Sequence, residues 1–248
     1  IGLPADIFFG TGIPTIVMVL RKSRPTRDVL IVDASKGFKK EGKKNKLRAS
    51  DIKRIVDTYI SKKEEPKFSR LVTKEEIRAN GYNLNIPRYV NSSDDAETWD
   101  LYATMFGGVP KGELSAMDRY WDAFAGLKNS LFKQTDIPQT EFKVTDIQKT
   151  VENHHSVVGF KNMFSEKFGG FSEMLHHRLL DNLQSLNIAA EEDAITSYIF
   201  NQLEQMPLVD RFEAYQLFAD KWQTISQDLE IIQSEGFEAT RMVDANWV

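Results

Sequence analysis

Cysteine is absent from this 248-residue sequence, and its eight prolines are never adjacent. Disulfides, thiolate metal ligands and cysteine nucleophiles are therefore excluded, which is typical of a cytoplasmic protein. No apolar run reaches the roughly 18 residues that a membrane-spanning helix needs, so we expect no contact with a membrane. The chain opens on Ile1-Gly2-Leu3-Pro4, which resembles the exit of a strand cut in its middle, and we expect a piece of a longer protein.

The charged residues are divided unequally along the chain. Residues 1–90 hold 20 Lys and Arg against 10 Asp and Glu, a net charge of +10. Residues 91–248 hold 12 against 26, a net charge of −14. Such a split predicts two units with different partners, of which the basic one faces a polyanion.

The first apolar segments predict strands. Residues 14–20 and 29–32 are apolar on both faces, as in strands buried within a sheet. The short turn between them predicts a hairpin, and hence an antiparallel pair. Residues 82–90 alternate as in an edge strand, because Pro87 forbids a central place.

Helical patterns lie between and beyond these strands. Ser50 is expected to cap a helix along residues 50–60, and Thr73 to begin a shorter helix that ends near Asn80-Gly81. After a polar boundary at residues 91–95 the pattern becomes helical. Its segments run over residues 113–132, 143–168, 171–187, 190–205 and 209–233.

Two motifs suggest small ligands but have simpler explanations. Gly10-Thr11-Gly12 lacks the third glycine and the following helix of a dinucleotide-binding loop. The pairs His154-His155 and His176-His177 offer one inward ligand each at best, because neighbouring side chains on a helix diverge by about 100°. We therefore expect surface or capping histidines and no metal site.

A basic, glycine-punctuated loop is expected at residues 36–48, with Lys39, Lys40, Lys43 and Lys44 at its centre. These ammonium groups are either simply solvated or in contact with nucleic-acid phosphates, where released counterions provide affinity. Charge alone leaves both interpretations open.

Aromatic and polar side chains offer further candidates. Phe8 and Phe9 precede the first buried strand, where loops of an α/β sheet line the ligand crevice, yet the residues alone favour a place in the core. The polar set of the expected edge strand can hydrogen-bond a base or a phosphate, and it equally suits a solvated edge. This set is Asn83, Asn85, Arg88 and Tyr89.

Three blocks of sequence, in this order, resemble the modification (M) subunits of type I restriction–modification systems, a family of adenine-N6 DNA methyltransferases. They lie at residues 3–20, 29–35 and 81–90. Gly107-Gly108-Val109-Pro110, the segment around Tyr120-Trp121, and residues 208–222 resemble the family's C-terminal extension more loosely.

This resemblance implies a fold and a reaction. The fold class is α/β: residues 1–90 would be the end of a Rossmann-like catalytic sheet, residues 91–110 a linker, and residues 111–248 a mostly α-helical domain for subunit assembly. The family transfers a methyl group from S-adenosylmethionine to adenine N6. Its cofactor loop and its Asn-Pro-Pro-Phe motif precede the first block and are absent here, so we expect no catalytic or cofactor-binding residue and no activity from this chain alone.

The resemblance also implies a site residue and partners. In related adenine methyltransferases an aromatic side chain before the last hairpin packs on the flipped target base, a position that falls on Phe8, with Phe9 as the alternative. The implied partners are DNA, the specificity (S) subunit, a second M subunit and the restriction (R) subunit. The rival interpretation is a non-enzymatic helical adaptor whose basic N-terminal segment binds nucleic acid, which explains the charge split but not the three blocks.

Overall fold

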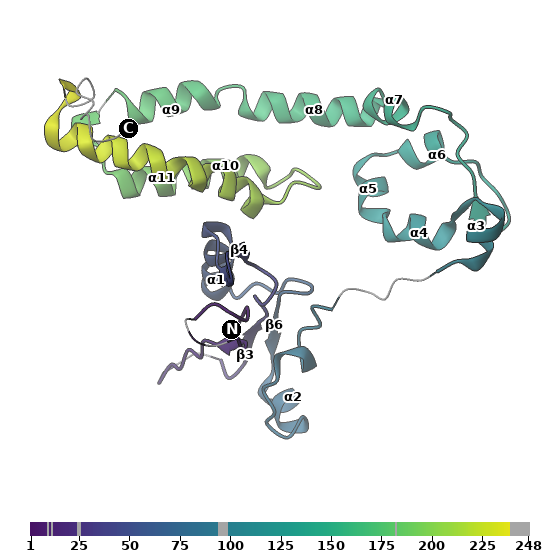
Figure 1. The fold of residues 1–248 in the computed structure, drawn as a ribbon, viewed down its shortest axis with the longest axis horizontal. Helices are drawn as coiled ribbons and strands as arrows, with labels where there is room; N and C mark the ends of the chain where they lie inside the picture. Colours follow the sequence, from purple (N-terminus) through teal and green to yellow (C-terminus); the bar gives the residue numbers. More distant parts are fainter. Residues whose placement is uncertain (9, 11, 24–25, 94–98, 182, 239–248) are drawn as a thin grey trace. The chain divides into compact units, whose positions relative to one another are not determined.

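The computed structural model describes residues 1–8, 10, 12–23, 26–93, 99–181 and 183–238. The chain divides into two compact units (Figure 1). The first comprises residues 1–96 with 212–220, and the second comprises residues 97–211 with 221–248. No helix within the described ranges is both long and apolar enough to cross a membrane.

The first unit mixes short strands with two helices. Its elements are β1 (Gly2–Leu3), β2 (Thr15–Ile16), β3 (Val29–Val32), β4 (Lys39–Glu41), β5 (Lys44–Lys46), α1 (Ala49–Ser61), β6 (Ser69–Val72), α2 (Lys74–Ala79) and the 3-10 turn η1 (Ile86–Arg88). This arrangement agrees with the expected α/β class, while the strands within the described residues form only small sheets.

The central pairing differs from the expected hairpin. β3 pairs antiparallel with β6, with Val29 opposite Val72. β1 pairs antiparallel with β2 and is also bridged in parallel to Asp33 at the end of β3. The prediction that residues 14–20 pair with residues 29–32 is therefore wrong, because β1 makes backbone contacts with both segments.

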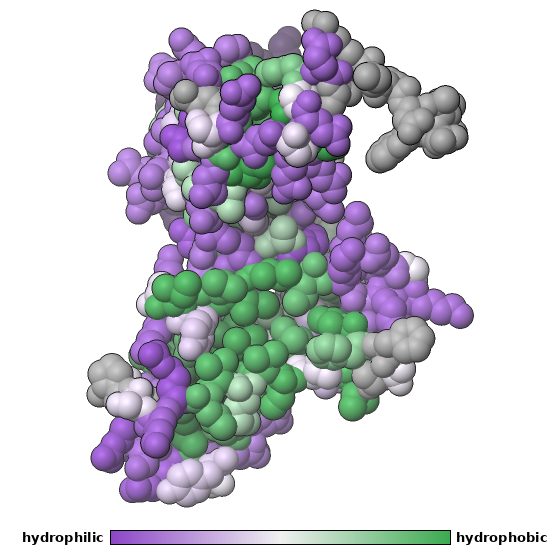
Figure 2. All heavy atoms as spheres, turned by 90° about the vertical axis from the view of Figure 1, so that its left-hand side faces the viewer, coloured by the Kyte–Doolittle hydropathy of each residue, from purple (hydrophilic) through white to green (hydrophobic). Residues whose placement is uncertain are grey.

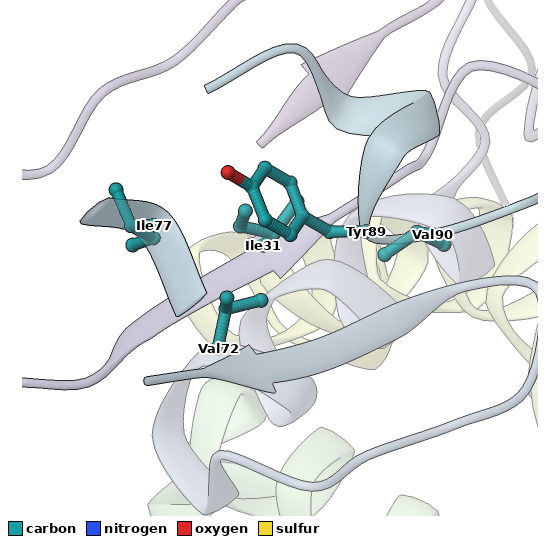
Figure 3. Packing of buried hydrophobic residues seen from close by; sticks show 5 residues of the cluster. All are labelled: Ile31, Val72, Ile77, Tyr89 and Val90. Atoms are coloured by element: carbon teal, nitrogen blue, oxygen red, sulfur yellow. The ribbon is translucent and has the colours of Figure 1, made fainter. Parts of the chain in front are cut away.

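The two faces of β3 belong to different apolar clusters, as its alternating side chains require. Ile31 packs with Val72 of β6, Ile77 of α2 and the neighbouring pair Tyr89 and Val90 (Figure 3). On the opposite face Val32 and Ala34 pack with Phe68, and Ile55 of α1 joins them. Burial of these side chains fixes α1 and α2 on opposite faces of the strand pair.

A large apolar surface remains exposed on the first unit. Ile16, Met18 and Leu20 are 64%, 60% and 84% exposed. The expectation that residues 14–20 form a buried strand is therefore wrong, because no described element packs over them. Residues 16–19 line one side of a groove of about 440 Å³ that β3 and the end of α1 complete. Figure 2 shows the apolar side chains gathered over this unit.

Both predicted helices of the first unit are present, with one different cap. α2 begins at Thr73, whose hydroxyl accepts a hydrogen bond from Glu76 N, and ends at Asn80 as expected. α1 begins two residues earlier than expected, because Arg48 occupies the N-cap and Ser50 is buried within the first turn. Its apolar stripe is partly solvent-exposed, since Ile60 is 71% exposed.

Residues 82–90 do not form the expected edge strand. Pro87 lies in η1, where its fixed φ and missing N–H favour a tight turn. The hydroxyl group of Tyr89 donates a 2.6 Å hydrogen bond to the carbonyl of Asn83, so the segment folds back on itself. Local hydrogen bonds therefore replace a strand ladder.

The second unit is helical, as predicted, but three of the five expected segments are divided or shorter, while the last two helices have the expected lengths with bounds shifted by two residues. Its elements are α3 (Leu101–Phe106), β7 (Val109–Pro110), α4 (Lys111–Ala116), α5 (Asp118–Ala123), α6 (Leu127–Leu131), β8 (Gln139–Thr140), α7 (Ile147–Glu152), α8 (His155–Phe168), α9 (Phe171–Leu179), η2 (Leu183–Ser185), α10 (Ile188–Leu203) and the part of α11 (Arg211–Glu235) beyond residue 220. The expected segment 113–132 is three helices, and Gly126 with φ of 84° separates the last two. α3 lies inside the expected linker.

An apolar cluster and a separate set of helix contacts organise the described part of the second unit. Leu114, Leu127 and Val157 join α4, α6 and α8, and Trp121 Nε1 donates a 2.7 Å hydrogen bond to the Leu114 carbonyl. Further along the chain α9 contacts α10, and Gln233 of α11 donates hydrogen bonds to backbone carbonyls around η2 (Figure 1).

Candidate nucleic-acid interface

The loop after β1, residues 4–12, carries the first candidate side chain and is called the Phe8 loop below. Pro4 is fully buried, and the chain then turns through Asp6 and Gly10, whose φ angles are 56° and 80°. Phe8 is 53% exposed and is not a member of any buried cluster of the described residues. Phe9, the alternative candidate, lies outside the described residues.

The basic segment forms a hairpin instead of the expected loop. β4 and β5 pair antiparallel, with Glu41 opposite Lys44, and Gly42 and Lys43 form the two-residue turn. Gly42 has a φ of 62°, a conformation at the first turn position that favours glycine in tight hairpins. Residues 39–46 are called the lysine hairpin below.

The four candidate lysines have two kinds of environment. Lys39, Lys40 and Lys43 are exposed, and no carboxylate pairs with them within the described ranges. Lys44 is half-buried, and its Nζ donates a 2.9 Å hydrogen bond to the carbonyl oxygen of Phe8. Three positive charges thus face solvent, while the fourth holds the aromatic loop.

Asn45 adds two further hydrogen bonds between the lysine hairpin and the Phe8 loop. Its backbone N–H donates to the Asp6 carbonyl at 3.1 Å, and its side-chain Nδ2 donates to the Ala5 carbonyl at 2.9 Å. Together with the bond from Lys44, the hairpin donates hydrogen bonds to three carbonyl groups of the loop, those of Ala5, Asp6 and Phe8. The structure therefore brings the candidate aromatic and the candidate lysines together.

Asp51 fixes the base of the lysine hairpin to α1. Its two carboxylate oxygens receive the guanidinium of Arg48 at 3.1 and 3.0 Å, and the Arg48 backbone N–H donates to it at 2.8 Å. Hydrogen bonding to Asp51 raises the pKa of Arg48 further above its usual range. On the other stem a Cβ atom at Gly37 would lie 2.9 Å from Asp51 Oδ1, so this close approach requires glycine.

Asp33 joins the end of β3 to two other segments. It accepts hydrogen bonds from the Ser35 backbone N–H at 3.0 Å and from the Ser92 hydroxyl at 2.6 Å. Burial alone would raise the pKa of Asp33, but these hydrogen bonds outweigh it and hold the pKa below its usual value. The Ala34 N–H donates to the Gly2 carbonyl at 2.9 Å, so the same corner also positions the start of the Phe8 loop.

The remaining polar candidates are used mainly in local structure. Tyr89 is buried, and Asn83 Oδ1 accepts a 2.9 Å hydrogen bond from the Asn85 N–H. Arg88 is exposed. These side chains are not brought to the Phe8 loop by any contact between the described residues.

The histidine pairs do not form a metal site among the described residues. His154 caps α8, because its Nδ1 accepts from the Ser156 N–H at 3.4 Å and lies 2.7 Å from the Ser156 hydroxyl. Partial burial and the neighbouring His155 lower the pKa of His154. His177 Nδ1 is hydrogen-bonded to the carboxylate of Asp181, four residues further along the chain, a partner that the sequence pattern did not reveal.

Comparison with known proteins finds similar sequences for the N-terminal part of the chain. Residues 1–98 match the model of the N-6 DNA Methylase family. The Type I restriction enzyme MpnII methylase subunit of Mycoplasma pneumoniae is 39% identical over 102 residues, which are 41% of this chain and 19% of that protein. The MjaVII methylase subunit of Methanocaldococcus jannaschii is 36% identical over 124 residues, which are 47% of this chain and 22% of that protein.

A solved structure is also similar. The crystal structure of a methyltransferase subunit of a type I restriction-modification system from Streptococcus thermophilus shares 49% sequence identity over 37% of this chain and 20% of that chain, with a TM-score of 0.36. The matches thus span about a fifth of the length of these relatives. The resemblance to the methylase subunits of type I restriction enzymes is thereby confirmed for residues 1–98, the part of the chain that matches the N-6 DNA Methylase family.

Proposed function

We propose that this chain acts within the modification subunit of a type I restriction–modification enzyme, whose intact form transfers a methyl group from S-adenosylmethionine to adenine N6 in DNA. The observation that carries the proposal is the exposed ring of Phe8 beside an exposed set of lysines, in the part that matches the N-6 DNA Methylase family. An aromatic face next to positive charge suits a nucleic acid, whose bases stack and whose phosphates attract cations.

In this proposal the chain binds and positions DNA. Phe8 packs on the extruded adenine and replaces part of the stacking lost when the base leaves the duplex. Lys39, Lys40 and Lys43 contact phosphates, and Lys44 supports the loop that carries Phe8. The residues present do not fit S-adenosylmethionine, because the glycines at positions 10 and 12 lead into β2 and not into the N-terminus of a helix. We therefore assign no catalytic step to them.

The helical unit is proposed to serve assembly. Residues 91–248 carry a net charge of −14, which repels DNA phosphates and favours contact with protein. We propose that this part binds the S subunit in a cytoplasmic complex with a second M subunit and the R subunit. The similarity to methylase subunits does not favour the rival interpretation of a non-enzymatic adaptor.

The test is the identity of the product. A full-length M subunit that contains this chain, assembled with its S subunit, should convert adenine to N6-methyladenine in DNA, detected by nucleoside analysis after digestion. The control is an assembly whose Asn-Pro-Pro-Phe asparagine is replaced by alanine. Absence of methylated adenine with the wild-type subunit, while DNA is still bound, would support the adaptor interpretation.

A further inference from the structure

We propose that Asn45 is a positioning residue for Phe8, through which the lysine hairpin and the Phe8 loop act on DNA as one unit. This inference rests on the proposed function. Sequence patterns did not single out Asn45, and its side chain is not required for the hairpin pairing itself, since β4 and β5 pair through their backbones.

The contacts place Asn45 at the junction of the two segments. One residue supplies two donors to adjacent carbonyls, through Nδ2 to Ala5 at 2.9 Å and through its backbone N–H to Asp6 at 3.1 Å. Asp6 has a φ of 56°, so the backbone is held in a left-handed turn at this point. Two residues later the chain presents Phe8, whose side chain is 53% exposed.

The hairpin is rigid enough to impose this geometry. Its two stems meet at Asp51, which receives Arg48 through a forked pair of hydrogen bonds and packs against Gly37. Asp51 lies in the first turn of α1, and Ile55 of the same helix packs on the buried Val32 cluster. A continuous set of contacts therefore runs from the core through the hairpin to the Phe8 loop.

A phosphate contact on this hairpin would consequently fix the position of Phe8. Lys40 lies directly opposite Asn45 in the hairpin register. If Lys40 binds the backbone of DNA, Asn45 transmits that position to the loop through the Ala5 carbonyl. Removal of the Asn45 side chain should loosen the loop without removing Phe8 or any positive charge.

The experiment measures base extrusion in the assembled enzyme. The full-length M subunit with its S subunit is titrated with a duplex that carries 2-aminopurine at the target adenine, whose fluorescence rises when the base leaves the stack. Asn45→Ala should lower the ratio of extruded to stacked target base by about 3- to 10-fold, which is the effect of one lost hydrogen bond. The salt dependence of DNA binding should stay unchanged, because no charge is lost.

Matched variants separate positioning from stability. Asn45→Asp has nearly the same shape but lacks the Nδ2 donor, so it should also lower the extruded fraction, while its added negative charge should weaken DNA binding. Asn45→Gln keeps the donor and should restore part of the signal. Lys43→Gln removes a proposed phosphate contact and should reduce the salt dependence of binding. Lys63→Gln, a change outside the lysine hairpin, should leave both the salt dependence and the extruded fraction unchanged.

Three outcomes would overturn the inference. Normal extrusion by Asn45→Ala, with loss of extrusion by Phe8→Ala, would refute the role of Asn45 and leave the proposed function intact. Normal extrusion by both variants would refute the base-stacking role of Phe8 and the inference with it. Loss of extrusion in Asn45→Ala together with a lower thermal midpoint and an altered salt dependence would show a general loss of structure.

Discussion

Replacement of Phe8 by alanine separates the two interpretations of this residue. If the ring packs on the extruded adenine, the change removes one aromatic stacking partner. Such stacking contributes about 1–3 kcal/mol per base, which corresponds to a loss of about 5- to 150-fold in the extrusion equilibrium. If the ring instead belongs to the core, the change should cost about 3–5 kcal/mol of folding free energy.

The structure supplies the magnitude expected for stability. Full burial of a phenylalanine side chain stabilises a protein by roughly 1.5–3 kcal/mol. Phe8 is 53% exposed, so less than half of this burial is present, and the alanine methyl retains a small part. We therefore expect the free energy of unfolding to fall by about 1 kcal/mol, well below the cost for a core position.

The assay combines both quantities on one full-length, assembled enzyme. Chemical denaturation gives the free energy of unfolding, and 2-aminopurine fluorescence with the single-turnover methylation rate gives the effect on the target base. Phe9→Ala is the internal control. A loss of more than about 3 kcal/mol of stability with unchanged extrusion at Phe8 would refute the argument. Loss of extrusion in Phe9→Ala alone would move the role to Phe9.

Three further predictions concern charge, pH and the cofactor. A triple variant should lower the slope of log binding constant against log salt concentration by up to about 2.7, at roughly 0.9 for each lost phosphate contact; its changes are Lys39→Gln, Lys40→Gln and Lys43→Gln. An equal change of slope in a control triple variant, with Lys22→Gln, Lys62→Gln and Lys63→Gln, would contradict a specific role of the hairpin. The neutral His154 ring caps α8, and its pKa in the folded chain lies below the usual 6.5. The stability that this ring contributes is therefore present above about pH 6.5 and is lost as the pH falls through the folded-state pKa. Thermal midpoints measured over this range should lose that dependence in His154→Asn, which caps without titrating. The 248-residue chain alone should not bind S-adenosylmethionine, and a micromolar affinity in a calorimetric titration would disprove this expectation.

The sequence predicted helices better than strand partners. Thr73 and Asn80 mark the ends of α2 because capping depends on residues within one turn of each other. The partner of residues 29–32 depends on contacts distant in sequence: β3 pairs with β6 some forty residues later, and β1 pairs with the segment that was expected to pair with β3. The apolar side chains of residues 14–20 predicted a buried strand, but apolar character alone does not show whether another element covers that strand.

In the helical unit the apolar periodicity predicted the last two helices to within two residues, but it ran together helices that are separate in segments 113–132 and 143–168. The apolar periodicity continues where one helix ends and the next begins. Gly126 is the N-cap of α6 and His154 is the N-cap of α8, so a new helix begins after each of them. Both residues were visible in the sequence. Neither is a strong stop signal by itself, because a glycine inside a helical pattern is tolerated at modest cost.

The lysines show most clearly what residue types alone could not decide. Lys39, Lys40, Lys43 and Lys44 are chemically identical, and charge predicts one role for all four. In the folded chain Lys44 and its neighbour Asn45 turn toward the Phe8 loop, while the other three ammonium groups face solvent. This division arises from the hairpin register, in which Gly42 occupies the turn. The sequence did not predict the hairpin, because lysine, which is abundant in this segment, is a poor strand former. The link between the aromatic and basic candidates is therefore a property of the fold, and the Asn45 variants test whether DNA recognition depends on it.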